Sequence, residues 1–206
     1  MDITPIEGGT RLLNLLQRGL DDEQEHKRPI LWAGAGLSIP AGYPSLGQLA
    51  ERCREASVEP LSEELSGTEL IDEFIDKNGR GELDSLLAEV FTQKQHLPYH
   101  EDLARLPWHS IVTTNYDELI EDGHKAVGKQ YLRVRLEDNI DIEPPPDTRP
   151  IYKIHGDVTS FRETILSGRS YEEYGEKYER LVAWLDLWLP KRSIVFFGSS
   201  MTDPRI

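Results

Sequence analysis

Four short apolar runs, each ending in a turn of small and polar residues, constrain the fold of this 206-residue chain more than any other feature. Such runs are typical of buried strands, and the segments between them carry the apolar spacing of amphipathic helices. Strands that alternate with helices form a parallel sheet with helices on both faces. We therefore predict an α/β fold with a doubly wound parallel sheet. The four turns are GAGLS (34–38), TTNYD (113–117), IHGD (154–157) and FGSSMTD (197–203).

The first run covers residues 29–33, the second 110–113, the third 151–154 and the last 193–197. Four leucines between residues 12 and 20 recur at helical spacing and predict an amphipathic helix there. Further elements follow from the same patterns: a strand at 131–134, a helix from near Tyr116 to before Gly128, a helix from Tyr171 whose apolar stripe packs on the sheet, and a helix after Asp203-Pro204.

The segment from Leu46 to His109 carries helical patterns alone. Its roughly sixty residues are far more than a strand-to-helix connection needs, since such loops are typically about 2–6 residues long. We expect a helical insertion over 46–109 that covers a site as a lid, within a single domain spanning 1–206. The chain stops where the helix after Asp203 should begin, so we expect it to be the N-terminal part of a longer protein.

Composition excludes several classes of function. Lys and Arg total 23 against 37 Asp and Glu, and the net charge of −14 argues against direct nucleic-acid binding. Cys53 is the single cysteine, which excludes an intrachain disulfide and a cysteine-based zinc site. The chain has no secretory signal pattern and no apolar stretch near the roughly 20 residues that span a bilayer. We expect a cytoplasmic protein with no membrane partner.

The glycine turn after the first strand suits a nucleotide. Gly34 and Gly36 permit a tight turn and close approach of a pyrophosphate, and a following helix N-terminus would favour its charge. The dehydrogenase fingerprint is broken, because Ile39 stands at its third glycine and no acidic residue ends a second strand about twenty residues later. Taken alone, the turn is equally consistent with a purely structural role.

Asn115 and Asp117 should lie at the carboxyl end of the second strand. A carboxamide there can donate and accept at once, which suits holding ribose hydroxyls or orienting a water. The alternative is that either residue caps the following helix. Gly198 and Ser199 end the last strand with small residues that suit close approach by a phosphate or a ribose, whereas Asp203 can serve as a helix cap.

His155 follows the third strand and precedes Gly156, which leaves room for a ligand. Imidazole titrates near neutral pH and can accept a proton from a sugar hydroxyl, and such general-base help is typically worth about 10²–10⁴ in rate. A histidine taken alone is more often structural. The motifs around His155 favour the catalytic interpretation.

Together, GAGLSIPAGYPS, TTNYDELIE, KIHGD and FFGSSMTDP resemble, in this order, the sirtuin-like domains of bacterial NAD hydrolases (NADases), many of which serve antiphage defence. The resemblance runs from about Ile30 to Pro204. It implies a Rossmann-type sheet with a helical module and with NAD, the substrate, bound between them. It further implies catalytic roles for Asn115, His155 and Asp117, and NAD binding by Gly34, Ala35, Gly36, Ser38, Thr114, Gly198, Ser199 and Asp203.

The departures from the family pattern narrow the expected activity. Deacylating sirtuins carry four zinc-binding cysteines after the HG motif, whereas residues 156–206 contain none. The GIPDFR-like stretch is also replaced, by GYPSLG at 42–47. The resemblance therefore implies no zinc ribbon and no metal, and hydrolysis of NAD to nicotinamide and ADP-ribose.

Two other functions stay open at this point, a module that senses NAD or ADP-ribose without turnover and, with less support, an NAD-dependent protein deacylase. The resemblance also implies assembly. A homo-oligomer is expected, together with a partner ATPase or a fused C-terminal sensor domain.

Overall fold

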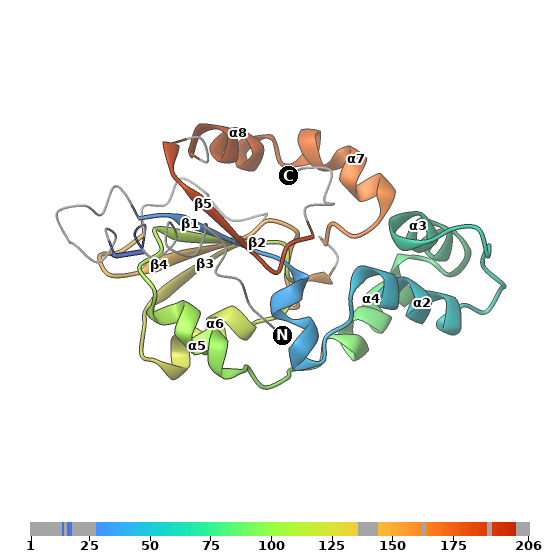
Figure 1. The fold of residues 1–206 in the computed structure, drawn as a ribbon. Helices are drawn as coiled ribbons and strands as arrows, with labels where there is room; N and C mark the ends of the chain where they lie inside the picture. The colour runs from blue at the N-terminus through green and yellow to red at the C-terminus, as the bar shows by residue number, and fades with distance from the viewer. Residues whose placement is uncertain are drawn as a thin grey trace, which may run out of the picture.

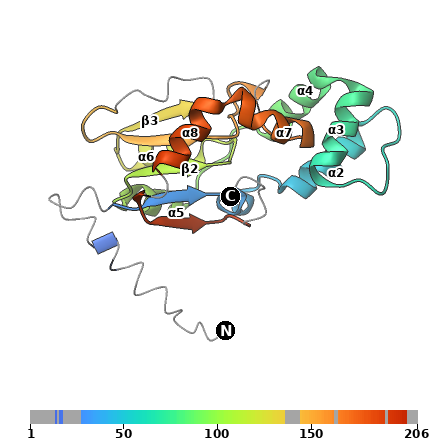
Figure 2. The ribbon, with the colours of Figure 1, turned by 90° about the horizontal axis from the view of Figure 1, so that it is seen from above.

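The protein folds around one sheet of five parallel strands. The computed structural model describes residues 14, 16–17, 28–135, 144–161, 164–188 and 191–200. The strands stand in the order β3-β4-β2-β1-β5 (Figures 1 and 2), which confirms the predicted parallel α/β class. Their bounds are β1 (Ile30–Ala33), β2 (Ser110–Thr113), β3 (Tyr131–Arg135), β4 (Arg149–Lys153) and β5 (Ile194–Phe197).

The register of the strands brings the four predicted turns to one edge of the sheet. Ala33 at the end of β1 pairs with Thr113 on one side and with Phe197 on the other, and Thr113 pairs with Lys153. All four strands thus end at the same level. In parallel sheets, ligands bind outside these carboxyl ends, at the point where successive connections leave in opposite directions. Here that point is β1, which is flanked by β2 and β5.

Helices cover both faces of the sheet, because alternate side chains of β1 point to opposite faces and all of them are apolar. Ile30 and Trp32 belong to the core under α7 (Gly168–Lys177) and α8 (Glu179–Trp188), and Leu31 and Ala33 belong to the core over α5 (Pro98–Arg105) and α6 (Leu119–Ala126). Figure 1 shows these two helix pairs above and below the sheet. Both faces of β1 are buried, which explains its unbroken apolar run.

Two predicted helices differ from the structure at their ends. The helix expected from Tyr116 begins at Leu119, because the polar turn after β2 extends that far. The helix expected from Tyr171 begins at Gly168 and is interrupted at Tyr178, whose backbone leaves the helical region (φ −122°, ψ 38°). The helix predicted over 12–20 is described only at residues 14, 16 and 17, and the helix expected after Asp203 lies outside the described residues.

The remaining helices form a module beyond the carboxyl ends of the strands (Figures 1 and 2). This helical module consists of α2 (Leu46–Ala56), α3 (Gly67–Asn78) and α4 (Arg80–Val90). Its apolar core, which includes Cys53, Leu70 and Phe74, extends to Leu119 of α6 and to Leu166. The segment 46–109, expected to form one helical insertion, has two parts in the structure. Residues 46–90 form the module, whereas α5 packs against α6 beneath the sheet.

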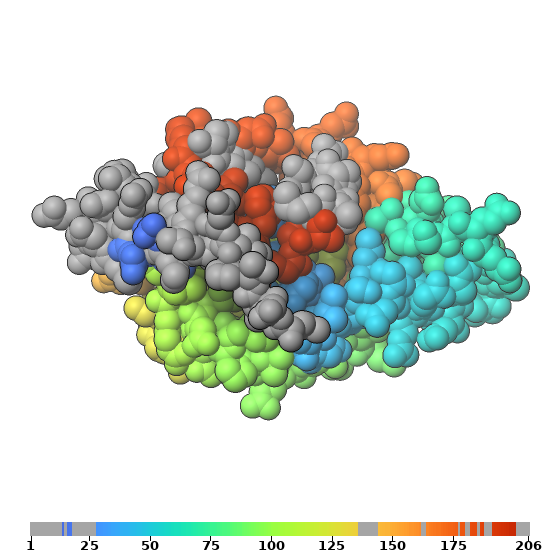
Figure 3. All heavy atoms as spheres, viewed as in Figure 1, coloured from blue at the N-terminus to red at the C-terminus, as the bar shows by residue number. Residues whose placement is uncertain are grey.

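Polar contacts join the helical module to the rest of the molecule. Arg169, at the start of α7, pairs with Asp72 (Nε to Oδ1, 3.0 Å) and Asp76 (Nη2 to Oδ1, 2.7 Å) of α3. Arg80 of α4 donates to the Phe161 carbonyl and to Thr164 Oγ1 (2.8 Å). In the space-filling view, the module forms one end of the molecule and α7 reaches it from above (Figure 3). Among the described helices, none is long and apolar enough to cross a membrane.

Candidate active site

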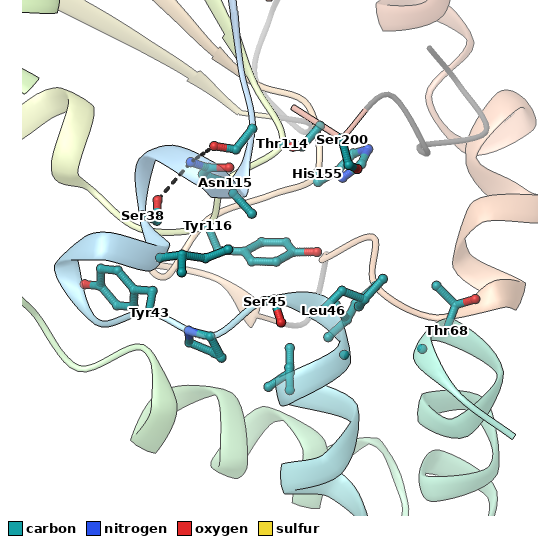
Figure 4. A pocket seen from close by; sticks show the side chains of 18 of the residues that line it. Ser38, Tyr43, Ser45, Leu46, Thr68, Thr114, Asn115, Tyr116, His155 and Ser200 are labelled. Carbon is teal, nitrogen blue, oxygen red and sulfur yellow. Dashed lines mark hydrogen bonds between the residues drawn. The ribbon is translucent and has the colours of Figure 1, made fainter. Parts of the chain in front are cut away.

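A cavity of about 1030 Å³ lies between the ends of the strands and the helical module. Its size is at the upper end of the roughly 300–1,000 Å³ usual for small-molecule sites, so it can take a dinucleotide. One side, which we call the sheet wall, includes residues 34–36, 38, 114–117, 155 and 198–200; the other, the module wall, includes residues 43–47 and 66–69. Figure 4 shows the Tyr116 ring between the two walls.

The structure brings the sequence-predicted site residues together on the sheet wall. Asp203 lies outside the described residues. The others all line the cavity: Gly34, Ala35, Gly36, Ser38, Thr114, Asn115, Asp117, His155, Gly198 and Ser199.

The two glycines after β1 hold the turn against the turn after β5. A Cβ at Gly34 would lie 2.7 Å from Gly198 O, and one at Gly36 would lie 2.7 Å from Gly198 Cα. The N–H groups of Gly34 and Gly36 donate to the carbonyls of Phe197 (3.0 Å) and Gly198 (2.8 Å). Gly198 itself has a left-handed backbone (φ 67°). These two N–H groups are therefore engaged within the protein, and the glycines serve close backbone packing at the cavity edge.

No α-helix follows this turn directly, contrary to the sequence expectation. Two 3₁₀ turns, η2 (Ala35–Leu37) and η3 (Ile39–Ala41), occupy that place. Pro40 lies where an α-helix begun at Ala35 would need an interior N–H, and Gly42 ends the second turn with φ 96°. The next helix is α2, whose first residues belong to the module wall.

Hydrogen bonds fix the amide orientation of Asn115, which lines the cavity. Its Nδ2 donates to the Gly34 carbonyl (3.0 Å) and to Ser38 Oγ (2.9 Å; Figure 4). A carbonyl can only accept, and Ser38 gives its single hydroxyl proton to Asp117 Oδ2 (2.6 Å), so both contacts require the NH₂ group. Oδ1 of Asn115 is buried and accepts no hydrogen bond from any residue that the structure describes. Such an atom is costly to bury unless a ligand satisfies it.

Asp117 makes the capping contact that the sequence offered as one alternative, and it also binds Ser38. Its Oδ1 accepts from the Leu119 N–H (3.0 Å) at the start of α6, and its Oδ2 accepts from Ser38. The carboxylate thus caps the helix and orients Ser38, which in turn orients Asn115. Both of its oxygens are used within the protein, which makes Asp117 a group that acts on the site through its neighbours.

His155 lies on the same wall, buried at 2 % exposure. Gly156 turns the chain immediately after it (φ 88°), and the His155 carbonyl accepts from the Ile165 N–H (3.0 Å). Its Nδ1 is 3.5 Å from the Tyr171 hydroxyl, and the Tyr171 ring stands edge-on to the imidazole at 5.3 Å between centroids. Sequence analysis assigned Tyr171 to the packing stripe of its helix, yet this residue also lines the cavity.

Sequence analysis missed the module wall. Ser45 accepts from the Gln48 N–H and caps α2, while Thr68 lies in the first turn of α3. Tyr43 stacks on Phe91 (5.4 Å between centroids), and burial, together with the nearby Asp117 charge, raises its pKa to about 12, so that it stays neutral. The Ser45-to-Gln48 capping pattern was readable from the chain, but nothing in it points to a ligand.

No group of three or more His, Cys, Asp or Glu side chains that could hold a metal ion occurs among the described residues. The acceptor on Asn115, the buried imidazole and a roomy cavity suit an organic ligand with hydroxyl groups. Within the part of the chain described, few ionisable side chains line the cavity. They are those of Glu69, Asp117 and His155, together with tyrosines.

Comparisons with known proteins agree with the motifs. The chain is 33% identical over 177 residues to the NAD(+) hydrolase ThsA of Cytobacillus dafuensis, which covers 84% of this chain and 35% of that protein. It is 31% identical over 189 residues to the ThsA of Acinetobacter baumannii, covering 89% and 39%. It is 25% identical over 198 residues to Defense-associated sirtuin 2 of Bacillus subtilis, covering 91% and 19%.

The chain therefore spans less than half the length of these relatives. A family model described as a SIR2-like domain matches residues 109–206. The predicted resemblance to sirtuin-like NAD hydrolases is confirmed. The matched region includes the strands and turns that carry Asn115 and His155.

Proposed function

We propose that this domain hydrolyses the bond between nicotinamide and ribose in NAD, releasing nicotinamide and ADP-ribose. The observation that carries the proposal is the held amide of Asn115, whose buried Oδ1 has no partner among the described residues and which lines the cavity on the same wall as His155. The names of the relatives, NAD(+) hydrolase and defence-associated sirtuin, support the substrate and a role in depleting NAD during bacterial antiphage defence.

In this proposal Asn115 and His155 divide the work. Asn115 Oδ1 accepts a hydrogen bond from a hydroxyl of the nicotinamide ribose or from the attacking water. His155 accepts the proton from that hydroxyl or water. The nicotinamide leaves as a neutral molecule from a positively charged ring, so the departure needs no acid. Positioning and exclusion of bulk water supply the rest of the rate.

The remaining predicted residues have supporting roles. Asp117 and Ser38 hold the Asn115 amide in its productive orientation. Gly34, Ala35, Gly36, Thr114, Gly198 and Ser199 form the surface against which the dinucleotide lies. The module wall closes over the substrate from the opposite side. We place Asp203 in the same site by resemblance alone.

The test follows nicotinamide release from NAD by the natural full-length protein. We expect Asn115→Ala and His155→Ala to lower kcat by at least about 100-fold, as loss of a general base or of substrate positioning does. His96→Ala is the matched control, since His96 pairs with Glu101 away from the cavity and should leave kcat unchanged.

Unchanged activity in both site variants contradicts the proposal. A saturable thermal shift with NAD, without product from the wild-type protein, would instead identify a sensing module. Nicotinamide release that requires an acylated peptide would identify a deacylase.

We further propose that residues 1–206 form one NAD-binding domain at the N-terminus of a longer, cytoplasmic protein, with the helical segment within 46–109 as its lid. Its relatives are more than twice as long as the matched region, which supports further domains. By resemblance we expect a homo-oligomer that works with a partner ATPase or a fused C-terminal sensor domain. Light scattering on the full-length protein measures the oligomeric state directly.

A further inference from the structure

A lysine is buried at the end of β4, directly behind the sheet wall. Lys153 is 1% exposed, and its Nζ donates to the backbone carbonyl of Asp117. It also lies 3.5 Å from Oε1 of Glu121, which is fully buried. A charge inside a protein is costly unless it is paired, so this arrangement needs a reason.

The pair belongs to a larger charged network along the same edge of the sheet. Arg133 of β3 contacts Glu118 (2.6 Å), Asp157 (3.3 Å) and Glu121 (3.7 Å). Burial raises the pKa of Glu121, against the opposing charges of Lys153 and Arg133. The network therefore joins β3, β4, the loop after β4 and the first turn of α6.

The position of Lys153 relative to the site is specific. His155 follows it by two residues, and the carbonyl that it binds belongs to Asp117, two residues after Asn115. A second bond, from the Val158 N–H to the Tyr116 carbonyl (2.9 Å), runs between the same two loops. Lys153 thus ties the loop that carries His155 to the loop that carries Asn115.

Stability alone does not call for this lysine. Replacing a buried ion pair by apolar side chains of similar volume is often neutral or stabilising. An apolar residue at the end of β4 would fill the same space but would leave the Asp117 carbonyl without the Nζ donor. The feature that an apolar residue cannot supply here is the bond from Nζ to the Asp117 carbonyl.

We propose that Lys153 is a positioning residue whose bond to the Asp117 carbonyl sets the spacing between Asn115 and His155, while Glu121 neutralises its buried charge. This inference rests on the proposed hydrolysis of NAD. Lys153 does not line the cavity and acts through the two loops that it joins.

The experiment compares Lys153→Met, Glu121→Gln and the double variant in the natural full-length protein. Lys153→Met leaves Glu121 with Arg133 as its cation and should lower both the melting temperature and kcat. The double variant removes both charges, so the melting temperature should return toward that of the wild type. Its kcat should stay about 10- to 100-fold low, with KM for NAD within twofold, because misplacement near 1 Å impairs chemistry more than binding. Glu121→Gln keeps the Lys153 bond and should retain most of kcat.

Full kcat in the folded double variant overturns the proposal, since a merely structural pair predicts that stability and kcat recover together. If the double variant does not fold, Lys153→Leu with Glu121→Leu replaces it, with the same expected split between kcat and KM. Failure of both to fold also overturns the proposal, because the pair would then be needed for the fold itself. The wild-type protein is assayed in parallel, which tests the proposed function separately from the role of Lys153. If the wild-type protein releases no nicotinamide, the proposed function itself is contradicted.

Discussion

The two walls of the cavity are held in place by different kinds of interaction. On the sheet wall, backbone bonds between the glycine turn and the turn after β5, and buried bonds among Ser38, Asn115 and Asp117, fix each group. The module wall depends on apolar packing shared with Leu119 and Leu166 and on ion pairs at its margin, where Arg169 remains 49% exposed. The comparison teaches that Asn115 and His155 lie on the wall with buried hydrogen bonds and backbone contacts, whereas the opposite wall is held in part by exposed ion pairs that salt weakens.

The largest effect is expected from filling the contact between the two glycine turns. In Gly36→Ala, the new Cβ would lie 2.7 Å from Gly198 Cα, a backbone atom that cannot move aside alone. We expect a loss of about 1–3 kcal/mol in the free energy of unfolding, as overpacking costs, together with a fall of about 100-fold in kcat.

Gly81→Ala in α4 is the control, because a Cβ there meets nothing within 4 Å, and it should stabilise the protein by about 0.4–1 kcal/mol. Denaturant unfolding and nicotinamide release measure the two quantities. Equal stability of Gly36→Ala and wild type would show that the sheet wall is less rigid than its backbone contacts indicate.

A smaller effect is expected from Ser38→Ala, which interrupts the chain of bonds from Asp117 to Asn115. The Asn115 amide keeps the Gly34 carbonyl but loses its second acceptor, so it holds its orientation less firmly. We expect kcat to fall about tenfold with little change in KM, since the loss affects orientation at the reacting centre.

Ser85→Ala provides the matched serine control, because its hydroxyl bonds only to the Gly81 carbonyl on an exposed helix face. Steady-state kinetics at several NAD concentrations separate kcat from KM. A rise in KM with kcat unchanged would mean that Ser38 contacts the substrate directly.

The smallest effect is expected at the module wall. Arg169→Ala removes the pairs with Asp72 and Asp76, and exposed ion pairs contribute little to stability. We expect KM for NAD to rise about threefold with kcat unchanged, and high salt to reproduce this rise in the wild type because it screens exposed charges.

Arg105→Ala is the control, since Arg105 is similarly exposed but pairs with Glu101 and Asp102 on α5. Kinetics at low and at high salt are the measurement. If Arg169→Ala lowers kcat as strongly as Ser38→Ala does, the two walls share the chemistry and the comparison fails.

The sheet wall was predictable from the sequence because parallel strands end at a common edge. Four apolar runs, read with the turns after them, were enough to place Asn115 and His155 on one site. The module wall was not predictable, because Ser45 and Thr68 reach the cavity through the packing of α2 and α3 beyond the strands. No periodicity along a helix reports where its first turn lies relative to a distant sheet.

The glycine turn and Lys153 show a different limit of the sequence pattern. The sequence left a phosphate-binding and a structural role open for the glycines of GAG, and it gave no sign of their contact with the turn after β5, which lies more than 150 residues away in the chain. Lys153 stands within a predicted strand, and its spacing gives no sign that it is buried or that its partners are the Asp117 carbonyl and Glu121. Both roles depend on long-range neighbours rather than on local pattern.

The contact of Gly34 and Gly36 with Gly198 also has an evolutionary consequence. A side chain gained at any of the three positions would push the turns after β1 and β5 apart, so the three positions form one unit of selection. Among relatives that keep this sheet, the three glycines should be retained or lost together. If the two turns changed independently, one loop would have to become longer to accommodate the new side chain. A different loop length after β5 would identify relatives in which this happened.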